Sequence, residues 1–170
     1  MWSESCQEAL NKQINIELDA SQQYLSLHNF FLRNDIGLTN IAKYFKKASE
    51  EEREHAFKMI EYQNKRGGRV FMTNIKDYNY KIRGTQNESD ILIAFKMVLQ
   101  LEKKVYQHLL ELHRVADNNS DPQFADYIEG EFLEEQVEAI YELEKQVAIL
   151  KRIGNNGYET WEFNNKLNVE

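Results

Sequence analysis

The chain has 170 residues and a formal net charge of -7, with 1 proline, 7 glycines and 1 cysteine. The acidic balance excludes the concentrated basic face that nucleic-acid binding needs, and the lone Cys6 excludes an intramolecular disulfide and a cysteine-based metal site. The scarcity of helix breakers favours long helices in one domain. Because the chain opens without the blocks of a signal peptide and no run could span a membrane, we expect a cytoplasmic protein with no membrane partner.

Two long helices are predicted in the first half of the chain. The first begins with Ser3 or Ser5 as its N-cap and continues to about Arg33, and the second begins with Thr39 as its cap and runs to about Arg66. The apolar stripe expected on the first helix is Leu10, Ile14, Leu18, Leu25 and Leu32. The stripe on the second helix includes two polar residues and reads Ile41, Phe45, Ala48, Glu52, His55 and Met59.

The second half predicts two more long helices after a connection over about 67–88, which includes an extended-looking stretch at 70–75. The third helix begins with Ser89 as its cap. The fourth begins at Asp121, whose capping side chain is followed by proline at the first helical position, and ends at Gly154. A short tail helix over about 158–166 has Trp161 as its anchor. A bundle over about 4–153 within a single domain, 1–170, is therefore expected.

The polar residues that interrupt the stripes are matched across the predicted turns. Glu17 and Glu52 are 35 positions apart with their midpoint in the first turn, and Glu102 and Gln136 are 34 apart with their midpoint in the second. Residues equidistant from the turn of a helical hairpin lie at the same height. Since about twenty extended residues reach roughly 66 Å and a 28-residue helix is about 42 Å long, the connection can run the length of the bundle. An all-α four-helix bundle with one long crossover is predicted.

Stacking the two hairpins brings five polar side chains to one level of the interior: Glu17, Glu52, His55, Glu102 and Gln136. Buried carboxylates need a partner or a metal, and this oxygen-rich set with one nitrogen suits iron or manganese and, opportunistically, zinc. One Glu and one Glu-x-x-His from each hairpin form a di-iron site in such bundles. The second hairpin has Ala139 in place of the histidine, so the second metal is expected to be held more weakly.

Each of these residues also has a structural interpretation. His55 alone could be a hydrogen-bonded core histidine, and Glu17 or Glu102 could lie at the edge of a stripe and reach water. Gln136 could be a hydrogen-bonding spacer. Tyr24, two turns beyond Glu17, could be a core aromatic residue, although its position also allows it to donate a hydrogen bond or an electron. The matched spacing favours the di-metal interpretation.

Several motifs resemble the heavy-type, catalytically active chain of animal ferritin over residues 5–154. They are Asn15-Ile16-Glu17-Leu18, Glu51-Glu52-Arg53-Glu54-His55-Ala56, Gln63-Asn64-Lys65-Arg66-Gly67-Gly68-Arg69, Leu101-Glu102-Lys103, Leu109-Leu110-Glu111-Leu112-His113 and Glu135-Gln136-Val137. The resemblance implies a ferritin-like four-helix bundle with a short C-terminal fifth helix. It also implies a hollow shell of twenty-four subunits, possible co-assembly with other ferritin chains, and storage of ferric mineral after Fe(II) is oxidised by dioxygen or peroxide.

The resemblance further implies roles for individual residues. Glu17, Glu52 and His55 would hold the first iron, with Glu52 bridging to a second iron served by Glu102 and Gln136, and Tyr24 would be the nearby tyrosine. Three groups of further metal-binding residues would be Asp126, Glu129 and His113 at a three-fold channel, Glu131 and Glu135 on the way inward, and Glu50, Glu51 and Glu54 at the mineral nucleation site.

The chain departs from the ferritin pattern at four places. Phe57 replaces a cavity-facing acid, Ala125 replaces a cysteine, the crossover is about five residues longer than usual, and the tail barely matches the usual apolar fifth helix.

The sequence leaves three functions open. The first is a cage that oxidises and stores iron, and the second is a protective or structural metal-binding cage with little ferroxidase turnover. The third is a small di-iron oxygenase or peroxidase with an organic substrate. The complete ligand set favours the first.

Overall fold

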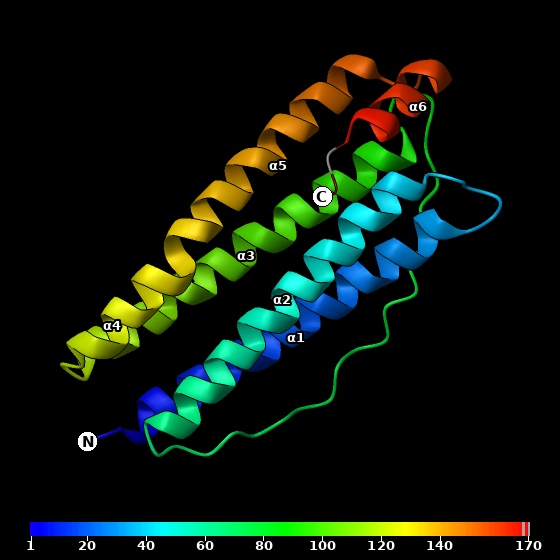
Figure 1. The fold of residues 1–170 in the computed structure, drawn as a ribbon. Helices are drawn as coiled ribbons and strands as arrows, with labels where there is room; N and C mark the ends of the chain where they lie inside the picture. Colours follow the sequence, from blue (N-terminus) through cyan, green and yellow to red (C-terminus); the bar gives the residue numbers. More distant parts are fainter. Residues whose placement is uncertain (168, 170) are drawn as a thin grey trace.

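Four long helical rods lie side by side in the computed structural model, which describes residues 1–167 and 169 (Figure 1). The elements in chain order are α1 (Glu4–Leu32), α2 (Thr39–Lys65), α3 (Asp90–Asn118), α4 (Pro122–Ile128), η1 (Glu129–Leu133), α5 (Glu134–Ile153) and α6 (Gly157–Lys166). The short π-helix η1 joins α4 and α5 into one rod. No strand occurs in the described part of the chain, and none of its helices is long and apolar enough to cross a membrane. The predicted all-α bundle with a short C-terminal helix is confirmed.

Three of the predicted helix starts are capped as expected. The side chains of Ser3, Ser89 and Asp121 accept hydrogen bonds from backbone N–H groups three residues later, at 3.1, 3.1 and 3.0 Å. The predicted cap at Thr39 is wrong, because Thr39 is the first residue of α2 and its N-cap, Leu38, forms no side-chain bond.

The free N–H groups at the start of α2 are satisfied from a distant part of the chain. Asn164 of α6 accepts hydrogen bonds from the backbone N–H of both Asn40 and Ile41 at 3.1 Å. Phe163 is buried beside it, with its ring edge-on to Phe95 at a centroid distance of 5.8 Å. Trp161 is 56% exposed, so Phe163 and Asn164 anchor the tail, and the expected anchor at Trp161 is wrong.

The core of α1 follows a slightly different stripe from the predicted one. Leu10 and Ile14 are fully buried, but Leu25 and Leu32 are 44% and 52% exposed. A step of four residues overshoots one helical turn by about 40°, so the two steps from Leu10 to Leu18 rotate the predicted line away from the core, whereas the buried line follows steps of seven residues. The residues that replace it inside are Tyr24, Leu27 and Phe31.

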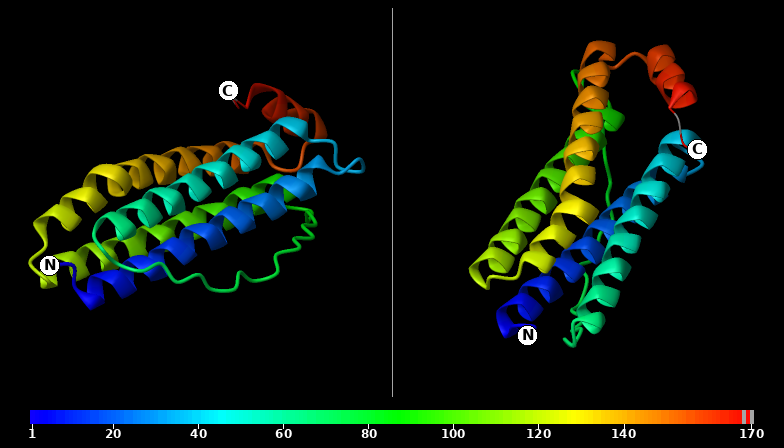
Figure 2. Two further views of the ribbon diagram at one scale, coloured as in Figure 1. Left: turned by 60° about the horizontal axis from the view of Figure 1, so that its bottom comes forward. Right: turned by 60° about the vertical axis from the view of Figure 1, so that its left-hand side comes forward.

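The crossover runs along the outside of α1 for most of the length of the bundle, as the three ribbon views show (Figures 1 and 2). Asn11 accepts from the N–H of Phe71 at 3.1 Å and donates to the carbonyl of Arg69 at 2.8 Å. Asn15 accepts from Thr73 at 2.9 Å and donates to the carbonyl of Phe71 at 2.9 Å. Asn11 and Asn15 are four helical residues apart, a rise of about 6 Å, and the crossover residues that they bind are two extended residues apart, about 6.6 Å. The spacing of the two amides on α1 therefore matches the spacing of the crossover backbone. These amides satisfy the backbone of a segment that has no β partner among the described residues.

Candidate metal centre

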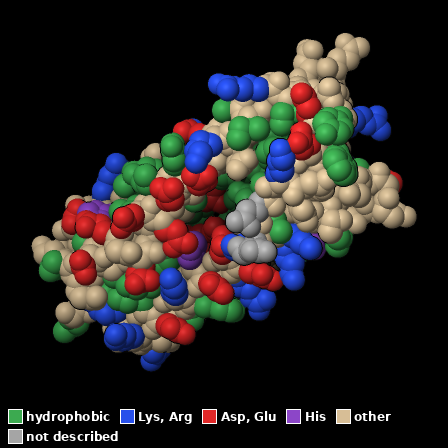
Figure 3. Space-filling model, turned by 45° about the horizontal axis from the view of Figure 1, so that its top comes forward, with side chains coloured by type: hydrophobic (Ala, Val, Ile, Leu, Met, Phe, Trp, Pro, Cys, Tyr) green, Lys and Arg blue, Asp and Glu red, His purple; other side chains and the backbone are tan. Residues whose placement is uncertain are grey.

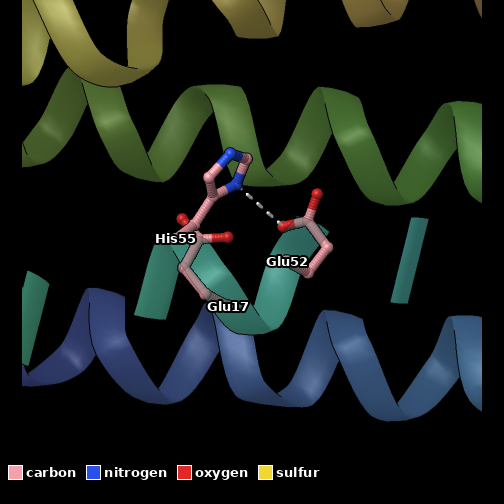
Figure 4. Close-up of side chains that lie close together, drawn as sticks. All are labelled: Glu17, Glu52 and His55. Atoms are coloured by element: carbon pink, nitrogen blue, oxygen red, sulfur yellow. Dashed lines mark ion pairs between the residues drawn. The ribbon is translucent and has the colours of Figure 1, made fainter. Parts of the chain in front are cut away.

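Glu17 of α1 meets Glu52 and His55 of α2 in the middle of the bundle. One possible ligand atom from each residue lies within 4.8 Å of the others. Figure 4 shows the His55 ring directed toward Glu52, with Nδ1 at 3.6 Å from Glu52 Oε2. Glu17 and Glu52 are only 1% and 6% exposed. The turn between α1 and α2 therefore brings the three side chains together inside the core, as the hairpin spacing predicts.

The second hairpin faces this group with Glu102 of α3 and Gln136 of α5, both buried. The amide Nε2 of Gln136 donates to the carbonyl oxygen of Glu102 at 3.1 Å and also to its carboxylate Oε2. The hydroxyl of Tyr24 donates to the other carboxylate oxygen, Oε1. The predicted pairing of Glu102 with Gln136 across the hairpin is therefore confirmed, and Tyr24 holds the same carboxylate from α1.

Two carboxylate oxygens at the first hairpin have no hydrogen-bond partner. Glu17 Oε1 accepts from the Gln13 amide at 2.7 Å, but Glu17 Oε2 and Glu52 Oε2 are buried and form no hydrogen bond. An unsatisfied buried carboxylate is costly, whereas bound cations compensate it directly. The donor set of carboxylates and one imidazole nitrogen suits iron, manganese or zinc.

Burial also raises the pKa values of the three carboxyl groups. Desolvation raises the pKa of Glu17 well above its usual range, and the charge of Glu52 adds to this effect. Desolvation, followed by the charge of Glu102, raises the pKa of Glu52 to about 8. Desolvation likewise raises the pKa of Glu102. These shifts favour the protonated form of the carboxyl groups when no cation is bound.

A cavity of about 230 Å³ connects these residues to the surface between α2 and α5. Its inner wall contains Tyr24, Glu52, His55, Glu102 and Gln136, and its outer wall includes Tyr44, Lys47, Glu51, Glu135 and Glu142. In Figure 3, acidic side chains gather around a hollow on one face of the molecule. This arrangement attracts cations to the mouth of a buried, carboxylate-lined site.

Glu135 lies closer to the centre than the sequence analysis expected. Its Oε1 is 3.4 Å from His55 Nε2, so the two ring nitrogens of His55 face Glu52 and Glu135. Glu51 lines the mouth of the same cavity, and burial raises the pKa of its carboxyl group.

The remaining predicted metal-binding residues lie on the surface. Glu50 and Glu54 are exposed along α2, and Phe57 of that helix is also exposed, beneath the Arg53 guanidinium at 5.2 Å from the ring centroid. Glu131 pairs with Lys58 at 3.2 Å.

The predicted channel group is partly assembled within one chain. His113 Nε2 lies 2.6 Å from Glu129 Oε1, and His113 Nδ1 lies 3.3 Å from Asp117 Oδ2. Asp126 is exposed on α4. Asp117 is an addition to the predicted channel group.

Apolar periodicity does not predict the π-helix η1, and Gly130 inside it is the signal in the sequence that could have indicated an irregular turn. A Cβ on Gly130 would meet no neighbouring atom within 4 Å, so packing does not require glycine. Glycine is a weak former of α-helix, and single π-turns occur frequently at functional sites. The π-helix η1 ends two residues before Glu135, so it leads directly into the part of α5 that carries Glu135 and Gln136.

Comparison with known proteins agrees with this architecture. A family profile described as a ferritin-like domain matches residues 7–153. The chain belongs to the ferritin family. Similar proteins include the chloroplastic ferritin of Malus baccata var. xiaojinensis, 46% identical over 98% of this chain and 66% of the relative. Ferritin-2, chloroplastic, of Zea mays is 46% identical over 96% and 65%, and ferritin-4, chloroplastic, of Arabidopsis thaliana is 45% identical over 98% and 63%. The chain thus spans slightly less than two thirds of these ferritins.

The comparisons correct two expectations. The ferritin resemblance is confirmed, but its narrower assignment to an animal heavy-type chain is not, since these relatives are plant ferritins. The cytoplasmic location expected from the sequence is wrong, because the similar ferritins are chloroplastic proteins.

Proposed function

We propose that this chain oxidises Fe(II) and stores the ferric product. The observation that carries the proposal is the pair of unpartnered, buried carboxylate oxygens on Glu17 and Glu52, beside His55 Nδ1 at 3.6 Å from Glu52. Iron is a substrate here, and these three residues bind the first Fe(II) ion. Glu52 bridges to a second ion served by Glu102 and Gln136. Zinc or manganese competes for the same ligands.

The chain's own residues prepare the site for oxidation by dioxygen or peroxide. Tyr24 and Gln136 orient the Glu102 carboxylate, while Gln13 orients Glu17. The carboxyl groups release protons when Fe(II) enters, which restores their charge where the ferric product needs it. Because Gln136 and Ala139 replace a Glu-x-x-His pair, the second ion is held more loosely and leaves more easily.

The surface residues supply and receive iron in the same proposal. His113, Asp126 and Glu129 form the entry channel, with Glu131 and Glu135 passing ions to the centre, and Glu50, Glu51 and Glu54 start the mineral. Such roles need a cage, and a homo-oligomer of twenty-four single-domain subunits, with possible co-assembly with other ferritin chains, is proposed by analogy with the family. The chloroplastic relatives favour action in a plastid.

The test is aerobic addition of Fe(II) to the metal-free protein, first at two ions per subunit and then at several hundred per particle. Ferric absorbance and particle size are followed together. A fast phase that saturates near two ions per subunit, then mineral retained in a large soluble particle, is expected. The double variant Glu52→Gln/His55→Ala should lose the fast phase but remain assembled. Glu138→Gln, an exposed change on α5, is the matched control. A normal rate in the double variant would sink the proposal.

A second candidate is a metal-binding protective cage with little turnover. The exposed Phe57, covered by Arg53 where the family pattern has an acid, favours it. That protein would bind the first ions stoichiometrically without a fast phase of ferric absorbance, so the same titration separates the two functions. A monomer or dimer would instead favour the small oxygenase.

A further inference from the structure

A continuous run of aromatic rings leads away from the metal centre to the end of the bundle where α4 begins. The ring of Phe132 in η1 lies edge-to-face against His55, with centroids 5.7 Å apart. Phe132 contacts Tyr127 of α4 at 5.4 Å, and Tyr127 stacks on Tyr62 of α2 at 3.9 Å with an interplanar angle of 6°. The α4 and η1 segments thus connect His55 to a stacked pair of phenols.

Packing alone does not favour two phenols at this place. Aromatic pairs prefer offset or edge-to-face arrangements over close parallel stacking. The hydroxyl of Tyr127 is buried and has no hydrogen-bond partner, so a phenylalanine would fill the same space without an unsatisfied polar atom. A phenol differs from a phenyl ring in one chemical property that matters beside a redox centre: it can give up one electron together with a proton.

The proton has a way out through Tyr62. The Tyr62 hydroxyl donates to Oε1 of Gln123 at 2.5 Å, and Gln123 is exposed to solvent. The amide oxygen is too weak a base to keep the proton, so solvent beside Gln123 accepts it. Loss of this proton leaves a neutral radical that the two stacked rings can share. The carboxylates of Glu131 and Glu61 act on Tyr127 electrostatically, and negative charge nearby makes loss of an electron easier.

The run has a natural end at this pair. Trp2 contacts Tyr62 at 5.9 Å, but the Arg66 guanidinium lies over the Trp2 ring at 4.5 Å. The indole N–H is held by Gln63 Oε1 at 2.8 Å, so oxidation of Trp2 would leave a radical cation directly beside a second positive charge. The same guanidinium lies over the Tyr62 ring at 5.5 Å and donates from Nη1 to the Tyr62 hydroxyl at 2.5 Å. A tyrosyl radical that has lost its proton is neutral, so Arg66 opposes oxidation of Trp2 more strongly than formation of that radical.

We propose that the stacked pair of Tyr62 and Tyr127 is a one-electron donor to the metal centre, through Phe132 and His55. The inference rests on the proposed oxidation of iron. Reduction of one hydrogen peroxide to two water molecules takes two electrons and two protons. When only one Fe(II) is bound, Fe(II) supplies one electron and the phenol supplies the other, together with one proton, while solvent supplies the second proton. The products are Fe(III), a neutral tyrosyl radical and two water molecules.

The experiment mixes the metal-free protein, loaded anaerobically with one Fe(II) per subunit, with excess hydrogen peroxide. Samples are frozen at intervals for electron paramagnetic resonance, and ferric absorbance is followed in parallel. We expect a tyrosyl radical in the wild-type protein and in Tyr141→Phe, which removes an exposed phenol of α5. The signal should be at least fivefold smaller in Tyr62→Phe/Tyr127→Phe at an unchanged ferric yield. The phenylalanine rings keep the packing, and equal melting temperatures check the fold.

The outcomes separate this inference from the proposed function. Ferric absorbance without a wild-type radical, an undiminished radical in the double variant, or loss of the radical in Tyr141→Phe would each overturn the donor pair and leave iron oxidation in place. Absence of ferric absorbance above the protein-free rate would overturn the proposed oxidation and the donor pair with it.

Discussion

The two helical hairpins carry equivalent polar positions but leave them in opposite states. In the hairpin of α1 and α2, Glu17 and Glu52 each keep an unpartnered buried oxygen. In the hairpin of α3 and α5, Gln136 donates to Glu102, whose second oxygen accepts from Tyr24. The first hairpin therefore requires a cation or a proton, whereas the second satisfies itself. An unsatisfied carboxylate marks where metal binds most strongly, and an internally bonded one marks where metal must compete with the protein.

Removal of the Glu52 carboxylate should have the largest effect on the proposed iron oxidation. Glu52→Gln is expected to slow iron oxidation by about 100-fold, equivalent to about 2.7 kcal/mol, because in the proposed centre the first ion would lose a ligand and the second would lose the bridge. The same change should stabilise the metal-free protein by about 1 kcal/mol, since the new amide can donate to the unpartnered oxygen of Glu17. Stopped-flow absorbance and denaturant unfolding of chelated protein measure the two effects. A less stable metal-free variant would contradict the contrast between hairpins.

The corresponding change in the second hairpin should act on stability in the opposite direction. Glu102→Ala leaves the Gln136 amide and the Tyr24 hydroxyl without their shared acceptor, and each such group costs about 1–3 kcal/mol. The metal-free variant is therefore expected to unfold at clearly lower denaturant concentration. Glu54→Ala, an exposed change on α2, serves as the control for loss of a carboxylate. If Glu102→Ala is no less stable than this control, the second hairpin does not satisfy itself.

The pH dependence of the metal-free protein should report the burial of the Glu52 carboxyl group. The pKa of Glu52 is raised from 4.5 to about 8 in the folded state, so between these values the folded protein keeps a proton that the unfolded chain releases. This group then lowers stability as pH rises from 4.5 to about 8 and adds no further change above that. A decrease of a few degrees in melting temperature is expected for chelated wild-type protein. Glu52→Gln should flatten this slope, and an unchanged slope would assign it to other groups.

Giving the second hairpin the same ligand types as the first should produce the smallest of these changes, a moderate gain in affinity for the second ion. Gln136→Glu together with Ala139→His supplies the missing Glu-x-x-His, and the second ion is expected to bind about tenfold more tightly, a gain of about 1.4 kcal/mol. Since a tighter site releases product more slowly, repeated turnover should fall while the first turnover is kept. Titration with a redox-inert divalent ion measures affinity, and repeated Fe(II) additions measure turnover. Unchanged affinity for the second ion would mean that Gln136 does not limit its binding.

The sequence by itself determined the elements and the pairing of the centre. Apolar periodicity placed the long helices, and equal distance from the turns predicted that Glu102 faces Gln136, because both depend on the fixed rise and repeat of an α-helix. The predicted line misled at Leu25 and Leu32, because its two earlier steps of four residues had already rotated it by about 80° away from the core.

Only the tertiary structure decided which polar atoms find partners. The cap of α2 comes from Asn164, more than a hundred residues away in the chain, and the crossover is held by amides on α1. The contact between Glu135 and His55 depends on the path of the chain through η1. Each of these contacts joins separate elements whose relative rotation is set by packing. Local propensity and periodicity do not contain that rotation, so the site's geometry emerges only when the helices come together.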